Sequence, residues 1–354
     1  MAATYLHLTA GAWSRLRRVW RLPVTPGLLR QAYLYGPVRS VVAAFQSFVV
    51  GSGPIREADA IFVLGFWRSG TTLMHELLSQ DERFCFPSNY AAFHPHHFVF
   101  TGKAALARGD KEIRRPQDGM TTGWGTPQED EFALLALGAR SPYEGLIAAA
   151  DFGEAMMLAD PQDLPVGERK KWETVFLRFF RAVRFAHHGK AMVLKSPPHS
   201  YRVKTLRKLL PRARFILMVR DPTEVFESMM KTYRAFTLRY GLVPGLPNRE
   251  LRELVLKERL RCEEKLQSGL AGLGDDQLAV VKFEDLIADP VATIEKIYRQ
   301  FALADFESLR PKLMARAGRG GGVARSASLP PPPWQERLKT AWSDIFARYG
   351  YQAR

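Results

Sequence analysis

The sequence predicts an α/β fold built as a doubly wound parallel sheet with helices on both faces. Short apolar segments rich in Val, Ile, Leu and Phe alternate with stretches of helical pattern along most of the chain. Each apolar segment is nearly continuous, as expected for strands that helices cover on both sides. Basic residues follow directly after several of these segments, where open α/β sheets bind their ligands.

The elements can be placed by residue number. The expected strands are Ala60–Leu64, Ala191–Lys195, Arg214–Val219 and Leu278–Phe283. The expected helices are Thr71–Ser79, Glu168–His187, Ser200–Leu210, Thr223–Tyr233, Arg249–Leu270, Val291–Phe301 and Trp334–Arg348. An irregular, aromatic-rich segment is expected from Phe84 to Thr122, either as a loop that carries specificity or as a satellite core.

Composition narrows the function classes. The chain has 354 residues and a formal net charge of +15, a balance that favours an anionic partner such as a nucleotide, a nucleic acid or an acidic membrane surface. The cysteines Cys85 and Cys262 lie far apart in the sequence, so we expect neither a disulfide framework nor a zinc site. The predicted location is therefore cytoplasmic.

The N-terminal residues 1–56 are expected to form a basic helical extension to a main domain at residues 57–354. No acidic residue precedes Glu57, and apolar residues interleave with Arg15, Arg17, Arg18 and Arg21. Two interpretations stay open for this stretch: peripheral contact with a membrane surface, or an ordinary helix packed on the main domain. No apolar run reaches the ~18 residues of a membrane-spanning helix.

A glycine-bounded loop follows the first expected strand. Residues Gly65–Leu73 form a turn that aims backbone N–H groups at one point, in front of a helix N-terminus. Gly65 and Gly70 keep the spacing of Walker A glycines, but Thr71 replaces the Walker lysine and the positive charge lies earlier, at Arg68. The loop suits one phosphate that carries one further group, and the missing lysine argues against ordinary ATP chemistry. The alternative is a turn with incidental glycines.

A second basic turn follows the third expected strand. Asp221 fits a helix N-cap and Pro222 fits the first helical position, which leaves Arg220 at the carboxyl end of the strand. Ser228 follows eight residues later, in the next helix. An arginine and a hydroxyl can together hold a second phosphate, although Arg220 alone also fits a salt-bridge partner.

These motifs resemble those of the sulfotransferases that use 3′-phosphoadenosine 5′-phosphosulfate (PAPS). Gly65–Leu73 is similar to the family's 5′-phosphosulfate loop. Leu217–Ser228 is similar to its 3′-phosphate strand, loop and helix, with the same arginine-to-serine spacing. Val281–Leu286 resembles a late family strand, and Val193–His199 resembles a fourth shared strand end.

The resemblance carries expectations for the whole site. It implies a P-loop-like α/β fold, a sulfotransferase domain at 57–354, and a small-molecule, lipid or carbohydrate acceptor with a hydroxyl or amine. It also implies neither a metal nor ATP hydrolysis. The residues expected to bind PAPS are Arg68, Ser69, Gly70, Thr71, Thr72, Arg220 and Ser228.

The chain departs from the family pattern at three places. Arg68 stands where cytosolic members carry lysine, and Phe283 replaces the usual tyrosine. The late Arg-Lys-Gly loop is not present as such, and Arg316, Arg319 and Arg325 are candidates to replace it at the 3′-phosphate.

Catalysis requires cations near the leaving phosphate and a base near the acceptor. Arg68 is the first candidate cation and Lys195 the second, unless Lys195 is only a solvated strand end.

His199 is one candidate base, because in cytosolic members a histidine two residues after the strand lysine has that role. That position is Pro197 here, so His199 could instead cap a helix. Glu129 is the rival base, although a capping box begun by Thr126 would explain it structurally.

Two other functions compete with sulfuryl transfer. A P-loop small-molecule kinase would share the fold, but Thr71 occupies the position of its lysine. A non-catalytic nucleotide- or nucleic-acid-binding protein would explain the charge. A single-strand binder, however, spreads cations and aromatics along a groove, and here the clearest cations lie at strand ends. No nucleic-acid partner is expected.

Overall fold

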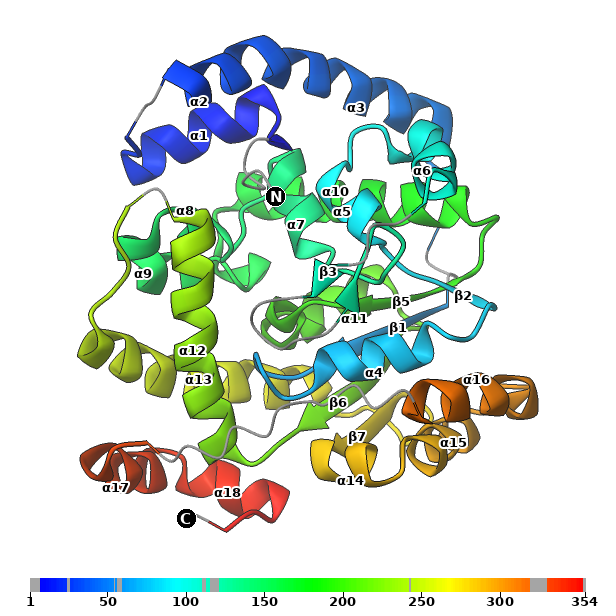
Figure 1. The fold of residues 1–354 in the computed structure, drawn as a ribbon, viewed down its shortest axis with the longest axis vertical. Helices are drawn as coiled ribbons and strands as arrows, with labels where there is room; N and C mark the ends of the chain where they lie inside the picture. Colours follow the sequence, from blue (N-terminus) through cyan, green and yellow to red (C-terminus); the bar gives the residue numbers. More distant parts are fainter. Residues whose placement is uncertain are drawn as a thin grey trace.

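The computed structural model describes residues 7–23, 26–53, 55, 59–109, 113–114, 121–241, 243–318 and 330–352. Its main sheet has five strands in the order β2-β5-β1-β6-β7, and all neighbouring strands run parallel (Figure 1). The strands are β1 (Ala60–Leu64), β2 (Phe84–Cys85), β5 (Ala191–Lys195), β6 (Arg214–Val219) and β7 (Leu278–Lys282). A short antiparallel pair, β3 (Ile113–Arg114) and β4 (Thr121–Thr122), lies outside this sheet.

Helices cover both faces of the sheet, as the sequence predicts. Phe62 and Phe215 point into a core shared with α10 (Val166–Ala186), α11 (Val203–Leu209) and α13 (Asn248–Leu270). The alternate residues Val63 and Ile216 point to the other face, which is covered by α4 (Thr71–Leu78), α15 (Pro290–Gln300) and α16 (Phe306–Gly318). Because successive side chains of a strand face opposite ways, both sides of the sheet are buried. The prediction of a doubly wound parallel sheet is confirmed.

The remaining helices surround this core. They are α1 (Ala10–Trp20), α2 (Pro26–Arg30), the π-helical turn η2 (Gln31–Tyr35), α3 (Gly36–Val50), α5 (Asn89–Phe93), α6 (Phe98–Ala107), α7 (Glu131–Leu137), α8 (Glu144–Ile147), α9 (Phe152–Met156), α12 (Pro222–Tyr240), α14 (Phe283–Ala288), α17 (Pro332–Ala341) and α18 (Ser343–Tyr349). Short 3-10 turns lie at Ala149–Asp151, Pro161–Asp163 and Pro197–Tyr201. None of the described helices has both the length and the hydrophobicity to cross a membrane.

Three expectations about individual elements are wrong. The aromatic-rich segment from Phe84 to Thr122 contains helices α5 and α6, and the Ser88 side chain caps α5. The fourth strand ends at Lys282, because the chain turns into α14 at Phe283. The last expected helix is two helices, broken at the fully buried Trp342, whose indole donates to the carbonyl of Leu256 (3.0 Å).

The N-terminal helices form an outer layer on the molecule (Figure 1). Helix α1 buries Ala12, Trp13 and Leu16 in a core cluster that also contains Leu135 and Ala136 of α7. The apolar side of α1 is therefore occupied by the rest of the protein, as in the interpretation of a helix packed on the domain.

The loop between β1 and α4 has a backbone that glycine makes possible. Gly65 has φ 146° and Gly70 has φ 94°, conformations that side chains with a Cβ rarely adopt. An added Cβ at Gly70 would overlap the ring of Phe283, and one at Gly65 would overlap the hydroxyl of Ser69. Arg68 also has a positive φ, 72°. Strained backbone of this kind is concentrated at functional sites.

A buried polar network joins the turn after β5 to the start of α7. Asp130 Oδ1 accepts hydrogen bonds from Ser196 Oγ (2.6 Å) and from His199 Nε2 (3.0 Å). Arg202 pairs with Glu131, and all five side chains are buried. Burial by itself would raise the pKa of Asp130, but His199, Ser196 and Arg202 outweigh burial and hold that pKa at about 2. The network fixes the position of β5 relative to α7.

Replacing Gly70 by alanine should destabilise the protein, because the new methyl group meets Phe283 and the left-handed φ disfavours a Cβ. We expect the free energy of unfolding to fall by about 1–3 kcal/mol in urea titrations. The double variant Gly70→Ala/Phe283→Leu should recover part of this loss. An unchanged midpoint for the single variant would contradict the described packing.

Replacing Asp130 by asparagine should remove stability that depends on pH. The folded-state pKa of Asp130 is depressed from 3.8 to about 2, so its contribution is complete above pH ~4 and is lost as pH falls towards ~2. The free energy of unfolding of the wild type should exceed that of Asp130→Asn by about 2 kcal/mol at pH 7, and by roughly half of that at pH 3. Asp276→Asn, at an exposed position, is the control. A difference in the free energy of unfolding between the two proteins that stays constant down to pH 3 would show that Asp130 does not titrate in this way.

Candidate active site

The two predicted phosphate motifs meet at the carboxyl edge of the sheet. Val63 is paired with Lys195 on one side of β1, and Leu64 with Leu217 on the other, so the residues that follow β1, β5 and β6 share one edge. Arg68 Nε donates to Ser228 Oγ at 2.9 Å. The loop after β1 is therefore in contact with the helix that follows β6.

Arg220 connects the same two motifs. Its guanidinium donates to the carbonyl of Arg68 (3.2 Å) and to Glu224 (2.6 Å), and it lies 4.2 Å from the centroid of the Phe283 ring. The predicted N-cap is present, since the Asp221 side chain accepts from Thr223 N with Pro222 in the first turn. Arg220 is held at the strand end by a carboxylate, a carbonyl and an aromatic face.

The late strand motif supports both phosphate motifs. Phe283 packs against Gly70 and carries Arg220 on its face. Glu284 accepts from the backbone N–H of Asp221 (3.2 Å) and from the hydroxyl of Tyr351 (2.7 Å). The late strand motif therefore belongs to the site because it supports the two phosphate motifs, although it has no candidate catalytic side chain.

Lys195 and Glu129 form an ion pair beside these motifs. Lys195 Nζ donates to Glu129 Oε1 at 2.5 Å, and Lys195 is nearly buried while Glu129 keeps some exposure. The hydroxyl of Tyr143 donates to the other oxygen of the carboxylate. Burial and the neighbouring carboxylate raise the pKa of Tyr143 well above its usual range, so this phenol stays protonated. The capping box expected at Thr126 is wrong, because α7 begins only at Glu131, after Asp130.

His199 occupies a different environment. Its side chain has no exposed surface, its Nε2 meets Asp130, and its ring stands edge-on to Phe62 and Phe176 at centroid distances of 5.2 and 6.2 Å. A base must come within hydrogen-bonding distance of the acceptor, and this position lies inside the core. The choice between His199 and Glu129 stays a prediction, and the geometry favours Glu129.

Other residues expected at the site lie as follows. Thr71 begins α4, whose first N–H groups have no acceptor within the helix. The Ser69 hydroxyl donates to the carbonyl of Phe66 (2.8 Å). Arg316 is paired with Glu76 of α4 at 2.9 Å. The other two candidates for the late loop, Arg319 and Arg325, lie outside the described residues.

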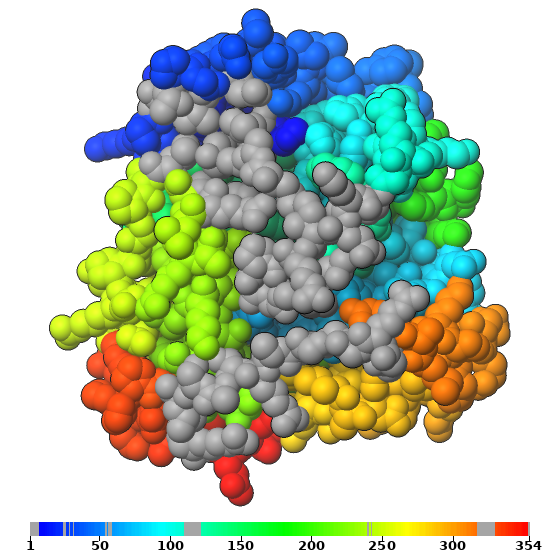
Figure 2. Space-filling view, viewed as in Figure 1, coloured from blue at the N-terminus to red at the C-terminus, as the bar shows by residue number. Residues whose placement is uncertain are grey.

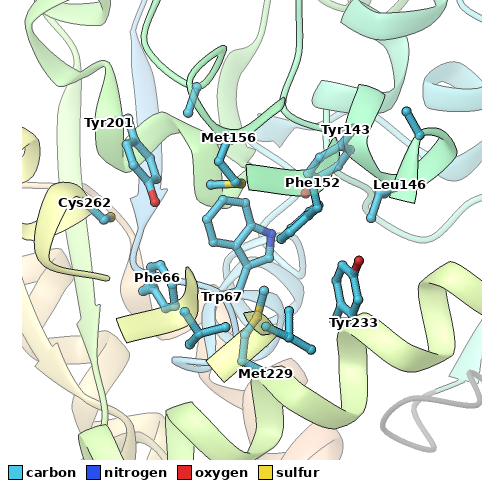
Figure 3. Packing of buried hydrophobic residues seen from close by; sticks show 14 of the residues in the cluster. Phe66, Trp67, Tyr143, Leu146, Phe152, Met156, Tyr201, Met229, Tyr233 and Cys262 are labelled. Carbon is cyan, nitrogen blue, oxygen red and sulfur yellow. The ribbon is translucent and has the colours of Figure 1, made fainter. Parts of the chain in front are cut away.

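A hydrophobic cluster anchors the β1–α4 loop and extends towards Glu129. Figure 3 shows Trp67 at its centre, surrounded by aromatic and methionine side chains from several helices. Tyr143 belongs to this cluster, and its ring contacts Phe132, which contacts Phe93, at centroid distances of 5.0 and 5.2 Å. Tyr143 is not predicted from the sequence, because no motif surrounds it. Glu129 therefore lies next to a row of aromatic rings.

The imidazoles of the N-terminal half do not add cations to the site. His94 lies 4.5 Å from His7 and 5.4 Å from His97 between ring centroids. Burial lowers the pKa of both His94 and His96 to about 3, so both are neutral at pH 7. Within the described ranges, no group of three or more His, Cys, Asp or Glu is placed to hold a metal ion.

The arrangement suits transfer of an anionic group. Gly65 and Gly70 let the loop after β1 pack tightly against Ser69 and Phe283. Arg68 and Arg220 supply positive charge at that loop, and the Lys195–Glu129 pair supplies a cation and a carboxylate beside it. Such a set of groups can bind a phosphate ester and can accept a proton.

Comparisons with known proteins agree with this chemistry. The sequence profile of the sulfotransferase family matches residues 60–308. The omega-hydroxy-beta-dihydromenaquinone-9 sulfotransferases Stf3 of Mycobacterium bovis (strain ATCC BAA-935 / AF2122/97) and Mycobacterium tuberculosis (strain CDC 1551 / Oshkosh) are each 30% identical over 351 residues, covering 96% of this chain and 89% of the relative.

Solved structures share the fold. Sulfotransferase STF9 from Mycobacterium avium has a TM-score of 0.65 at 16% identity, over 98% of this chain and 97% of that one. Sulfotransferase STF1 from Mycobacterium tuberculosis H37Rv has a TM-score of 0.62 at 18% identity, over 94% and 90% of the two chains. With the motifs at the sheet edge and the match over residues 60–308, the chain belongs to the sulfotransferase family and is a transferase of that class.

Proposed function

We propose that the protein transfers the sulfuryl group of PAPS to a hydroxyl group of a hydrophobic acceptor. The observation that carries this proposal is the convergence of Arg68, Ser228 and Arg220 beside the Lys195–Glu129 pair at one edge of the sheet. Two arginines suit a ligand with phosphates at two positions. Bound PAPS would supply the sulfuryl group and leave as adenosine 3′,5′-bisphosphate.

Each of the two phosphate motifs binds a different phosphate group of PAPS. The loop Gly65–Thr72 holds the 5′-phosphosulfate with its backbone N–H groups and with Arg68. Arg220 and Ser228 hold the 3′-phosphate. As the acceptor oxygen bonds to sulfur, the bond from sulfur to the phosphate oxygen breaks, and negative charge grows on that oxygen. Arg68 and Lys195 stabilise this charge.

Glu129 accepts the proton of the acceptor hydroxyl in this proposal. A carboxylate has about four lone-pair positions, so Glu129 can hold Lys195 and Tyr143 and still accept a further hydrogen bond. His199 acts through Asp130 as a positioning residue for the turn that follows Lys195.

The aromatic row next to Glu129 favours an apolar acceptor. Phe93, Phe132 and Tyr143 form consecutive ring contacts that end at the carboxylate. The two Stf3 relatives are named as sulfotransferases of omega-hydroxy-beta-dihydromenaquinone-9. We therefore infer a lipid-like alcohol, met by a cytoplasmic enzyme at the membrane surface.

Replacing Arg220 by alanine should weaken the binding of adenosine 3′,5′-bisphosphate about 10- to 100-fold, because charged hydrogen bonds to the 3′-phosphate are lost. Binding of AMP, which has no 3′-phosphate, should change much less. Calorimetry on both nucleotides measures the difference. The control is Arg337→Ala, at an exposed position on α17. Equal losses for both nucleotides would refute the assignment of Arg220.

Replacing Glu129 by glutamine should slow sulfuryl transfer about 10²- to 10⁴-fold, because the acceptor loses its base. Adenosine 3′,5′-bisphosphate should bind with nearly unchanged affinity. Replacing His199 by alanine should mainly lower the melting temperature, because a buried network loses one member. Single-turnover rates and thermal unfolding of both variants make the comparison.

The opposite pattern would identify the other base. If His199→Ala abolishes turnover in a protein that remains folded, while Glu129→Gln stays active, the proposed role of Glu129 is wrong. Tyr143→Phe serves as the intermediate case. It removes one hydrogen bond to Glu129 while the carboxylate and its pairing with Lys195 remain, so its single-turnover rate should fall between those of the wild type and Glu129→Gln.

A further inference from the structure

Helix α3 has its apolar side on the outside of the protein. Leu34, at the end of η2, and Val38, Val41, Phe45 and Phe48 of α3 are all exposed, Val41 by 70% and Phe48 by 83%. The spacing of four, three, four and three residues places them on one face of the helix. A surface helix of a soluble protein normally shows the reverse pattern, with apolar residues turned towards the core. We name these five residues the apolar stripe.

The inner side of α3 is formed by small and polar residues that have partners. Gly36 lies close to Ala10 of α1, whose backbone N–H donates to Ser40 Oγ (3.3 Å). Gln46 is buried, donates to the carbonyl of Pro95 (2.8 Å) and accepts from the N–H of Val99 (3.1 Å). Specific hydrogen bonds thus fix which side of α3 faces inward. The outward position of the stripe is built into the fold.

The exposed surface continues beyond α3. Phe100 of α6 is exposed and contacts Phe45 with ring centroids 5.6 Å apart, and Leu106 of α6 and Tyr33 of η2 are exposed as well. In Figures 1 and 2 the N-terminal helices form one edge of the molecule. Contiguous apolar patches of this kind mark surfaces that bind a membrane or another protein.

The charge around the stripe is entirely positive within the N-terminal segment. Residues 1–56 contain seven arginines and no lysine, aspartate or glutamate. Arg17, Arg18 and Arg30 are exposed, and Arg17 donates to the hydroxyl of Tyr33 (3.0 Å). A second copy of the same surface would bring two acid-free basic segments together, which is unfavourable. Anionic phospholipid headgroups would neutralise them.

We propose that the apolar stripe and the arginines beside it dock the protein onto a bilayer that contains anionic phospholipids. The stripe enters the headgroup region, the arginines contact lipid phosphates, and the tyrosines of η2 lie at the interface where aromatic side chains are favoured. The apolar side of α1 is buried, so α3 rather than α1 supplies the inserted residues. This inference deepens the membrane part of the proposed function by naming the surface that binds the bilayer. Vesicle binding is measured without turnover, so the docking surface and the proposed sulfuryl transfer are tested separately.

The test is co-sedimentation of the full-length protein with vesicles of phosphatidylcholine, with and without phosphatidylglycerol. We expect binding that phosphatidylglycerol strengthens and high salt weakens. The variant Val41→Glu/Phe48→Glu should lose affinity about tenfold or more for each residue, since each loses the transfer of an apolar side chain out of water. Met314→Glu, exposed by 61% on α16, is the matched control and should bind like the wild type. Unchanged binding of the double variant would overturn the proposal.

A second measurement reports contact without relying on loss of binding. Both native cysteines are buried, so Phe48→Cys can be labelled selectively with a polarity-sensitive fluorophore. Its emission should shift to the blue when anionic vesicles are added, and that of a label at Met314→Cys should not. Equal shifts at both positions would overturn the proposal. A third result would also overturn the proposal. If the wild type does not bind vesicles but forms a dimer in light scattering, and Val41→Glu/Phe48→Glu abolishes that dimer, then a second copy of the chain covers the stripe.

Discussion

The parallel alignment of β5, β1 and β6 is the constraint on which the site depends. Parallel strands place all their carboxyl ends at one edge, so the residues after each strand become neighbours although they are far apart in sequence. Arg68 and Arg220 thereby come into contact, and Lys195 ends the adjacent strand. Phe283, which begins α14 directly after β7, closes this group by packing on Gly70. A shift of one residue in the register of any pair would turn these side chains to the other face.

The buried polar network holds the Lys195–Glu129 pair in place. Asp130 and Glu131 have lost their contact with water, which is costly unless both are paired and hydrogen-bonded. Ser196, His199 and Arg202 provide those partners. The consequence is geometric, because Glu129 immediately precedes the two buried acids and Lys195 immediately precedes Ser196. Fixing the buried groups holds the partly exposed carboxylate within reach of the lysine.

Apolar side chains of the β1–α4 loop point into the core, whereas those of α3 in the N-terminal layer point to solvent. Phe66 and Trp67 leave the β1–α4 loop to join a core cluster, which anchors a strained backbone. Helix α3 does the opposite and keeps Val41 and Phe48 in contact with solvent. Helix α1 of the N-terminal layer packs on α7, which begins directly after the Glu129–Asp130 segment.

The sequence by itself determined four of the five strands of the main sheet, the positions of the two predicted phosphate motifs and the N-cap at Asp221. Strand hydrophobicity, glycine spacing and capping are local properties that neighbouring residues set. Only the tertiary structure decided the partners of the functional groups. The sequence offers His199 as the first candidate base and Glu129 as its rival. In the structure, burial against Asp130 separates His199 from solvent, while Lys195 and Tyr143 contact Glu129. Which side of a helix faces inward is likewise set by packing. The stripe on α3 points outward because hydrogen bonds and close contacts on its opposite side hold it there.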